Sequence, residues 1–177
     1  MLVYIFLLSF VTTVKASGTI QQCQRTVYAI ATFNGSTYAG SVYFTRQGPE
    51  MHITGSVSGL PRSKKLGVHI HEYGTTGNNC LDAGPHFNPF DSNHGGLTGS
   101  PRHPGDLGNL QVDDKGVMKF DLRVDISALY NYDGFLGRAI VIHANEDDLG
   151  LKNNEGSRAT GNSGQRLACA VIGIWKA

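Results

Sequence analysis

Eight short segments rich in strand-forming residues, separated by glycine-containing turns, constrain this chain more than any other feature of its sequence. In these segments apolar residues alternate with small or polar ones, which is the period of a strand with one buried face. Almost no stretch shows the period of a helix. We therefore expect an all-β protein, an antiparallel sandwich or barrel. The segments are 26–32, 38–46, 51–58, 66–72, 107–112, 117–124, 139–143 and 168–174.

Composition narrows the possible classes further. Glycine makes up 23 of the 177 residues, about twice its usual share, yet it shows no collagen repeat. Charged residues are only 16% of the chain, which argues against a disordered chain or a charged helical bundle. The net charge is +1, so we expect no nucleic-acid partner. So much glycine with few charges predicts many turns between short strands, and Asn34-Gly35 in particular predicts a hairpin.

The first residues predict export from the cell. Residues 2–8 are all apolar, and the run extends to Val14, which is shorter than the ~20 residues that span a membrane. Small residues follow, so we expect residues 1–16 to be a signal peptide cut near Ala16, with residues 17–177 forming a single domain. A buried first strand or a membrane anchor is the alternative. The prediction is a secreted protein without membrane association after cleavage.

Export bears on the three cysteines, Cys23, Cys80 and Cys169. An oxidising compartment permits one disulfide and leaves one thiol over, and the sequence by itself allows three pairings. Export also gives meaning to the triplet Asn34-Gly35-Ser36, which fits the N-glycosylation pattern and falls in the predicted turn. Asn34 is therefore a candidate glycosylation site.

Two long loops, residues 73–105 and 144–165, interrupt the strands, and loops of this length are usually functional. The first loop and the residue after it carry three histidines and an aspartate. Three imidazoles and one carboxylate are a complete tetrahedral set for zinc, and a set without an open position is of the structural type. Scattered loop histidines without a metal are the alternative. The four residues are His86, His94, His103 and Asp106.

A second group of histidines lies on predicted strands. His69 and His71 stand two positions apart, so both project from the face opposite the apolar residues of their strand. By the same alternation His143 faces away from its apolar neighbours. Imidazole-rich sites suit copper(II), and these three rings with one shared from the zinc group would supply four nitrogens. A polar strand face that happens to contain histidine is the alternative.

Several local strings resemble copper/zinc superoxide dismutase. They occur in the family's order and with near-family spacing, from about Val27 to the end of the chain. The resemblance implies the family's fold, an eight-stranded antiparallel Greek-key β-barrel of sandwich-like architecture. The strings are Gly67-Val68-His69-Ile70-His71-Glu72-Tyr73-Gly74, AGPHFNP at 83–89, HGG at 94–96, HPGDLGN at 103–109, GRAIVIH at 137–143, DDLG at 147–150 and GNSGQRLAC at 161–169.

The resemblance also implies roles for individual residues. The copper ligands would be His69, His71, His86 and His143. The zinc ligands would be His86, His94, His103 and Asp106. His86 would bridge both metals and Arg166 would attract an anionic substrate, which makes these two the catalytic residues. Asp147 would be the outer carboxylate that links a copper-side and a zinc-side histidine. Cys80 and Cys169 would form the intrachain disulfide.

The implied activity is that of a secreted superoxide dismutase with one copper and one zinc per chain. Two superoxide anions and two protons would become dioxygen and hydrogen peroxide while copper alternates between Cu(II) and Cu(I). An arginine keeps its charge at any relevant pH, so Arg166 could hold an anion without titrating. A catalytically inactive copper-binding or metallochaperone-like relative is the alternative. A homodimer is expected because the family is commonly dimeric.

The sequence departs from the family pattern in its loops. Pro104 replaces a common valine. Paired glutamates and a lysine usually guide anions in the second long loop, whereas residues 155–160 hold a single glutamate and Arg158. These changes bear on substrate guidance and leave the chemistry in place. Cys23 has no obvious family partner, and His52 lies outside the motifs, so we expect it to be an ordinary surface histidine.

Overall fold

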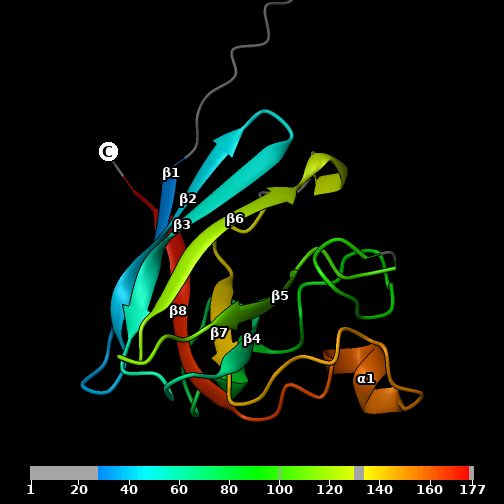
Figure 1. The fold of residues 1–177 in the computed structure, drawn as a ribbon. Coiled ribbons are helices and arrows are strands. Elements are labelled where there is room, and N and C mark those ends of the chain that lie inside the picture. Colours follow the sequence, from blue (N-terminus) through cyan, green and yellow to red (C-terminus); the bar gives the residue numbers. More distant parts are fainter. Residues whose placement is uncertain (1–27, 100, 130–133, 176–177) are drawn as a thin grey trace, which may run out of the picture.

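The computed structural model describes residues 28–99, 101–129 and 134–175, and within them eight strands curl into a nearly closed barrel (Figure 1). The all-β prediction is confirmed, and each predicted strand is found within two residues of its expected bounds. The strands are β1 (Tyr28–Asn34), β2 (Ala39–Gln47), β3 (Glu50–Ser58), β4 (Lys65–His71), β5 (Asp106–Gln111), β6 (Met118–Asp125), β7 (Ala139–His143) and β8 (Arg166–Ile174).

The strand order explains how residues far apart in sequence meet. The antiparallel sheet runs β5-β4-β7-β8-β1-β2-β3-β6, so the chain crosses over between β3 and β4 and again between β6 and β7. An isolated bridge between Val112 and Met118 brings the two edge strands together. Strands β4 and β7 are hydrogen-bonded neighbours, with His69 opposite Val141 and His71 opposite Ala139. This Greek-key arrangement therefore places the histidines of two distant segments on adjacent strands.

The barrel interior is filled by the apolar face of each strand. Val68 and Ile70 of β4 and Ile140 and Ile142 of β7 are fully buried in this core. Full burial of such side chains stabilises the fold by about 1.5–3 kcal/mol each. The opposite face of β4 is buried too, because the two long loops cover it, and His69 is 0% exposed there. The strand alternation predicted for the histidines is confirmed.

The turns show where local signals were incomplete. Asn34 and Ala39 pair at the end of the β1–β2 hairpin, so the predicted hairpin is confirmed, with a loop of four residues. The second long loop contains a short helix, α1 (Glu155–Thr160), which is too short to show a helical period in the sequence. Asn154 caps it by accepting the Ser157 N–H at 2.8 Å. Two 3-10 turns complete the description, η1 (Leu81–Ala83) and η2 (Ser127–Leu129).

Several sequence predictions fall outside the described residues. The expected signal peptide, residues 1–16, lies there, and so does Cys23. In the ranges that the structure does describe, no helix is long and apolar enough to cross a membrane. His52 is partly buried on β3 and contacts Asp121 Oδ1 at 2.9 Å, which agrees with its expected place on the outer surface of the barrel.

Candidate metal centre

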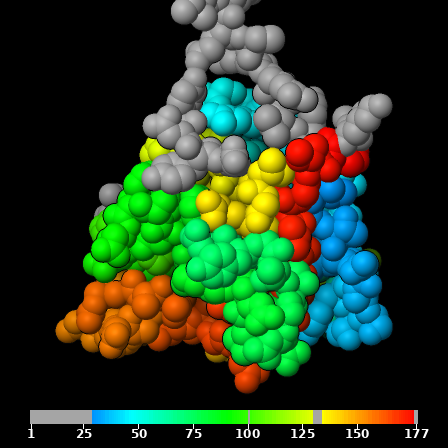
Figure 2. Space-filling view, turned by 180° about the vertical axis from the view of Figure 1, so that it is seen from behind, coloured from blue at the N-terminus to red at the C-terminus, as the bar shows by residue number. Residues whose placement is uncertain are grey.

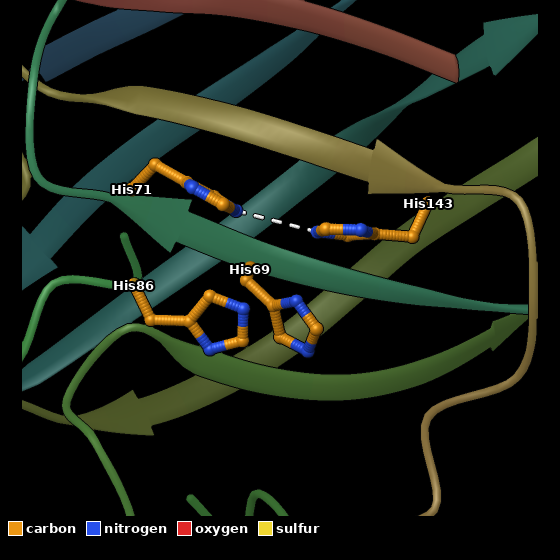
Figure 3. A group of neighbouring side chains, drawn as sticks. All are labelled: His69, His71, His86 and His143. Atoms are coloured by element: carbon orange, nitrogen blue, oxygen red, sulfur yellow. Dashed lines mark hydrogen bonds between the residues drawn. The ribbon is translucent and has the colours of Figure 1, made fainter. Parts of the chain in front are cut away.

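Four imidazoles converge on the outer face of β4 and β7 beneath the long loops. His69 and His71 come from β4 and His143 from the end of β7, while His86 reaches in from the first loop (Figure 3). Each residue offers one ring nitrogen, and these four nitrogens all lie within 4.8 Å of one another. All four residues are buried. Strands β4 and β7 carry three of the rings, and the first long loop carries the fourth.

Hydrogen bonds on the far side of these rings fix which nitrogen carries the proton. His71 Nδ1 lies 2.8 Å from Gly84 O and His143 Nδ1 lies 3.2 Å from Gly164 O. His69 Nε2 lies 3.0 Å from Asp147 Oδ2. Because these oxygens can only accept, each of the three nitrogens donates, and the inward nitrogen of each neutral ring is left bare.

The bare nitrogens are placed to hold a cation. His71 Nε2 and His143 Nε2 face each other at 3.3 Å, although neither has a proton to share. His69 Nδ1 and His86 Nε2 are buried without any hydrogen-bond partner. Orphaned buried acceptors are rare and need an explanation. The group therefore fits a copper ion, whose preferred ligands include imidazole nitrogens.

The second group gathers around one carboxylate oxygen, Asp106 Oδ1. It lies 3.0 Å from His86 Nδ1, 3.0 Å from His94 Nδ1 and 3.1 Å from His103 Nδ1. Bonds of ~2.0 Å to a tetrahedral zinc ion place neighbouring ligand atoms about 3.3 Å apart. The three distances to Asp106 Oδ1 are thus close to the ligand spacing of a zinc site. Three imidazoles and a carboxylate are also the donor set expected from the sequence.

Outer contacts orient the zinc group as they do the copper group. His103 Nε2 lies 3.0 Å from Ser92 O, which leaves its Nδ1 free to bind a metal. Asp106 Oδ2 accepts the backbone N–H groups of Gly95 and His103 at 3.0 and 2.8 Å. A ring nitrogen of His69 also lies within 4.8 Å of the group. His103 Nδ1 lies 3.1 Å from Asp106 Oδ1, so it too is placed to act as a ligand of this group.

His86 belongs to both groups. Its Nδ1 faces Asp106 at 3.0 Å, while its Nε2 is buried without a partner on the copper side. Its ring centroid is 3.9 Å from that of His69 and 5.5 Å from that of His103. One imidazole therefore connects the two groups through its two nitrogens.

The protein environment keeps the copper group neutral. Burial lowers the pKa of His69, His71 and His86, and positive charge on neighbouring rings lowers the pKa of His69 and His71 further. Burial also lowers the pKa of His143 to about 4. Only a neutral imidazole can bind a metal, so at neutral pH protons offer little competition for these four rings.

The zinc group behaves differently, because it contains the anionic carboxylate of Asp106 and contacts that of Asp147. Burial alone would lower the pKa of His94, but contacts with Asp106 and Asp147 raise it to about 9. Burial alone would raise the pKa of Asp106, but its contacts with His103, His86 and His94 hold that pKa well below its usual range. In the metal-free protein at neutral pH, His94 is therefore a cation held between two carboxylates.

Zinc binding at pH 8 is consequently expected to release about one proton per chain, because a cationic His94 must become neutral to act as a ligand. An imidazole with an ordinary pKa of ~6.5 would already be neutral at that pH and would release almost none. Calorimetric titration of metal-free protein with zinc in buffers of different ionisation enthalpy measures the number. A value near zero at pH 8 would contradict the raised pKa.

Asp147 ties the two groups together from outside. Its Oδ2 lies 3.0 Å from His69 Nε2 and its Oδ1 lies 2.8 Å from His94 Nε2. Its own position is fixed by Asn109, which accepts the Asp147 N–H at 2.7 Å. A buried carboxylate of this kind sets the orientation and tautomer of the rings that it holds.

Replacing Asp147 by alanine is therefore expected to weaken zinc binding by about 10–100-fold, the usual effect of losing such an outer partner. Competition with a chromogenic chelator measures the zinc affinity. Glu146→Ala provides a matched control, because the neighbouring carboxylate is 59% exposed and lies 4.0 Å from Lys65 Nζ. Equal zinc affinities in the two variants would show that Asp147 does not support the site.

Arg166 lies beside the copper group and is fixed by the loop that carries the disulfide. Its Nη1 donates to Cys80 O and its Nη2 donates to Gly84 O, both at 2.6 Å. Gly84 O also accepts the proton of His71 Nδ1, so one carbonyl links the guanidinium to a copper-side ring. Cys80 is bonded to Cys169, which is the pairing that the family resemblance implied.

Some groups that shape the centre gave no signal in the sequence. Backbone carbonyls of Gly84, Ser92 and Gly164 fix three of the rings, and residue type says nothing about them. Arg102 is partly buried, and its Nη1 donates to His103 O at 2.9 Å and to Asp106 O at 3.3 Å. Its place directly before the predicted zinc ligand His103 was the only available hint.

Fold and site together define a β-barrel metalloprotein in which an imidazole-only group and an imidazole–carboxylate group share one histidine. Residues 38–172 match the family model described as copper/zinc superoxide dismutase (SODC). The chain belongs to the copper/zinc superoxide dismutase family. The two buried groups accordingly fit its two cofactors, copper and zinc.

Individual relatives agree with this assignment. The chain is 60% identical over 146 residues to "Extracellular superoxide dismutase [Cu-Zn]" of Schistosoma mansoni, a match that covers 82% of this chain and 79% of the relative. It is 44% identical over 151 residues to superoxide dismutase [Cu-Zn] of Cryptococcus neoformans, covering 84% and 98%. The crystal structure of the clock protein EA4 superimposes with a TM-score of 0.78 at 40% identity, covering 85% and 96%.

Proposed function

We propose that this chain is an extracellular superoxide dismutase in which His86 bridges a copper and a zinc ion. The observation that carries the proposal is the pair of nitrogens on this one buried ring, Nδ1 directed at the zinc group and Nε2 orphaned on the copper side. The copper ligands are His69, His71, His86 and His143, and the zinc ligands are His86, His94, His103 and Asp106.

Different residues of the chain have different roles in the reaction. When bound, copper supplies the one-electron redox chemistry, and zinc, which has none, orders the loop. Peroxide formation consumes two protons, and His86 Nε2 can hold one of them next to the copper group whenever it is not serving as a ligand. Asp147 holds the rings of His69 and His94 in fixed orientations, so the site needs little reorganisation during turnover.

Arg166 supplies the charge that draws the substrate in. Its guanidinium is partly exposed and stays positive, and its two bonds to Cys80 O and Gly84 O hold it beside His71. A fixed cation at the site raises the local concentration of a small anion and orients it. Superoxide, the substrate that family membership implies, is such an anion.

The direct test is superoxide decay and peroxide formation by purified protein before and after loading with copper and zinc. We expect rapid decay only in the loaded protein, with metal analysis giving one copper and one zinc per chain. A folded and fully loaded protein that leaves superoxide untouched would overturn the proposal and support the inactive copper-binding relative. The described residues favour the enzyme, because every proposed ligand and Arg166 are retained.

Export and assembly complete the proposal. An apolar run at residues 2–8, the Cys80–Cys169 disulfide and the extracellular relative support a signal peptide over residues 1–16 and a secreted domain over residues 17–177. Amino-terminal sequencing of the secreted protein gives the cleavage point. A mature protein that begins before Ala16 would contradict it.

A homodimer is supported by two exposed apolar side chains of β8, Val171 on its outer face and Ile174 at its end. Val171 is 41% exposed and Ile174 is 79% exposed, and pairing two copies over this end of β8 would remove both from water. Analytical ultracentrifugation is expected to show a dimer for the parent chain. Replacing both residues by glutamate should shift it to a monomer, whereas a monomeric parent would contradict the proposal.

A further inference from the structure

A pocket beside Arg166 separates the β1–β2 hairpin from the loop that carries the disulfide. Its lining combines hairpin residues with Thr76, Asn79 and the disulfide partners Cys80 and Cys169. In the space-filling view the blue hairpin at the lower right adjoins the green segment of residues 75–90 (Figure 2). Cys80 is buried and Cys169 is only partly exposed, and because both line this pocket it gives solvent access to the disulfide.

Asn34 lies on the rim of the same pocket. It is the last residue of β1 and lines the pocket with its neighbour Gly35. Residues 34–37 are all exposed, so a group attached to the Asn34 amide would not disturb the packed barrel. The triplet Asn34-Gly35-Ser36 is an N-glycosylation acceptor. The acceptor amide and the disulfide thus share one pocket although they are far apart in sequence.

We propose that Asn34 carries an N-linked glycan whose first sugars cover this pocket and protect the Cys80–Cys169 disulfide from reduction. The inference rests on the extracellular part of the proposed function, since only exported chains meet the donor. In the transfer, Asn34 Nδ2 forms a bond to C1 of an N-acetylglucosamine. The bond from C1 to the lipid diphosphate of the donor breaks, and the amide loses one proton.

The pocket offers such a sugar suitable surroundings. An N-acetylglucosamine has apolar ring faces and polar edges. The lining supplies the aromatic ring of Tyr38 and the exposed side chain of Leu81 for the faces. Thr76 and Asn79, both exposed, offer hydroxyl and amide groups for the edges. None of the proposed metal-binding histidines lines the pocket, but Arg166 does, so a sugar there would lie beside Arg166 rather than against the proposed copper and zinc ligands.

Protection follows from the geometry of thiol–disulfide exchange. An attacking thiolate must reach one sulfur in line with the S–S bond, so the rate depends on access. A dithiol reductant gives two electrons, and its own sulfurs become a cyclic disulfide while Cys80 and Cys169 become thiols. A sugar in the pocket narrows the approach, and reduction should slow without any change in the barrel.

The test uses chains secreted from a glycosylating eukaryotic host. Ser36→Thr keeps the acceptor triplet and Ser36→Ala removes it, so the two variants differ at one exposed turn residue. Enzymatic release of the glycan converts Asn34 to aspartate, which peptide mass analysis detects. We expect this conversion in the parent and in Ser36→Thr but not in Ser36→Ala. An unmodified Asn34 in the secreted parent would overturn the proposal.

The second readout is the rate at which thiols appear in dithiothreitol, followed by alkylation and mass analysis. We expect reduction of Ser36→Ala to be at least about threefold faster than that of Ser36→Thr. Equal rates, with Asn34 glycosylated, would overturn the protective role. Neither readout depends on superoxide decay, which is measured separately on metal-loaded protein. Failure of the glycan proposal is therefore distinguishable from failure of the proposed enzyme activity.

Discussion

Replacing His86 by alanine is expected to reduce superoxide decay by at least about 100-fold, beyond the 10–100-fold typical for losing an outer partner of a metal ligand. The imidazole is a member of both groups, so its loss removes one donor from each. It also removes the buried Nε2 that can hold a proton beside the copper group. Activity and metal content are measured on the same preparation, loaded with copper and zinc.

Two control variants make the result specific. His103→Ala removes a zinc-side ring only, because His103 Nδ1 faces Asp106 and its Nε2 faces Ser92 O. It should lower zinc content and leave copper binding largely intact. His52→Ala removes a ring on the outside of the barrel, where a contact with Asp121 contributes less than about 1 kcal/mol. Full copper content and activity in His86→Ala would mean that the bridging assignment is wrong.

Much of this site could be predicted from sequence because strand alternation and ligand chemistry are local signals. His69 and His71 are two positions apart on a strand, so a shared face follows from backbone geometry alone. His94, His103 and Asp106 form a zinc-type donor set by residue type. The meeting of β4 with β7 is different, since the pairing of distant strands needs the family resemblance or the structure.

Two features were not predicted from the sequence, the orientation of the rings and the short helix in the second long loop, and each has its own physical reason. The rings are oriented by backbone carbonyls such as Gly84 O and Gly164 O, and every residue has a carbonyl. The helix α1 depends on how the second long loop packs, which a local sequence pattern does not encode. For α1 a capping signal was nevertheless present, since Asn154 precedes the helix and Gly161 with φ +63° ends it.

Removing the disulfide with the double variant Cys80→Ala/Cys169→Ala is expected to cost about 4–5 kcal/mol of stability in the chain-entropy model. The bond joins residues 89 positions apart, so its loss frees a long loop in the unfolded chain. For a domain of this size, that corresponds to a fall in melting temperature of roughly 8–20 °C. Thermal unfolding of the metal-free protein measures this effect without stabilisation by bound metals.

The same variant should also lose about tenfold or more in activity when loaded with metals, because small displacements of a positioning group are costly. Arg166 Nη1 donates to the carbonyl of Cys80 itself, so the bond that anchors this loop also anchors the guanidinium. Arg166→Lys separates the two effects, since lysine cannot reproduce the paired bonds to Cys80 O and Gly84 O. It should lower activity while changing the melting temperature less than the double variant does. A double variant that melts early yet decomposes superoxide at the parental rate would show that Arg166 keeps its place without the disulfide.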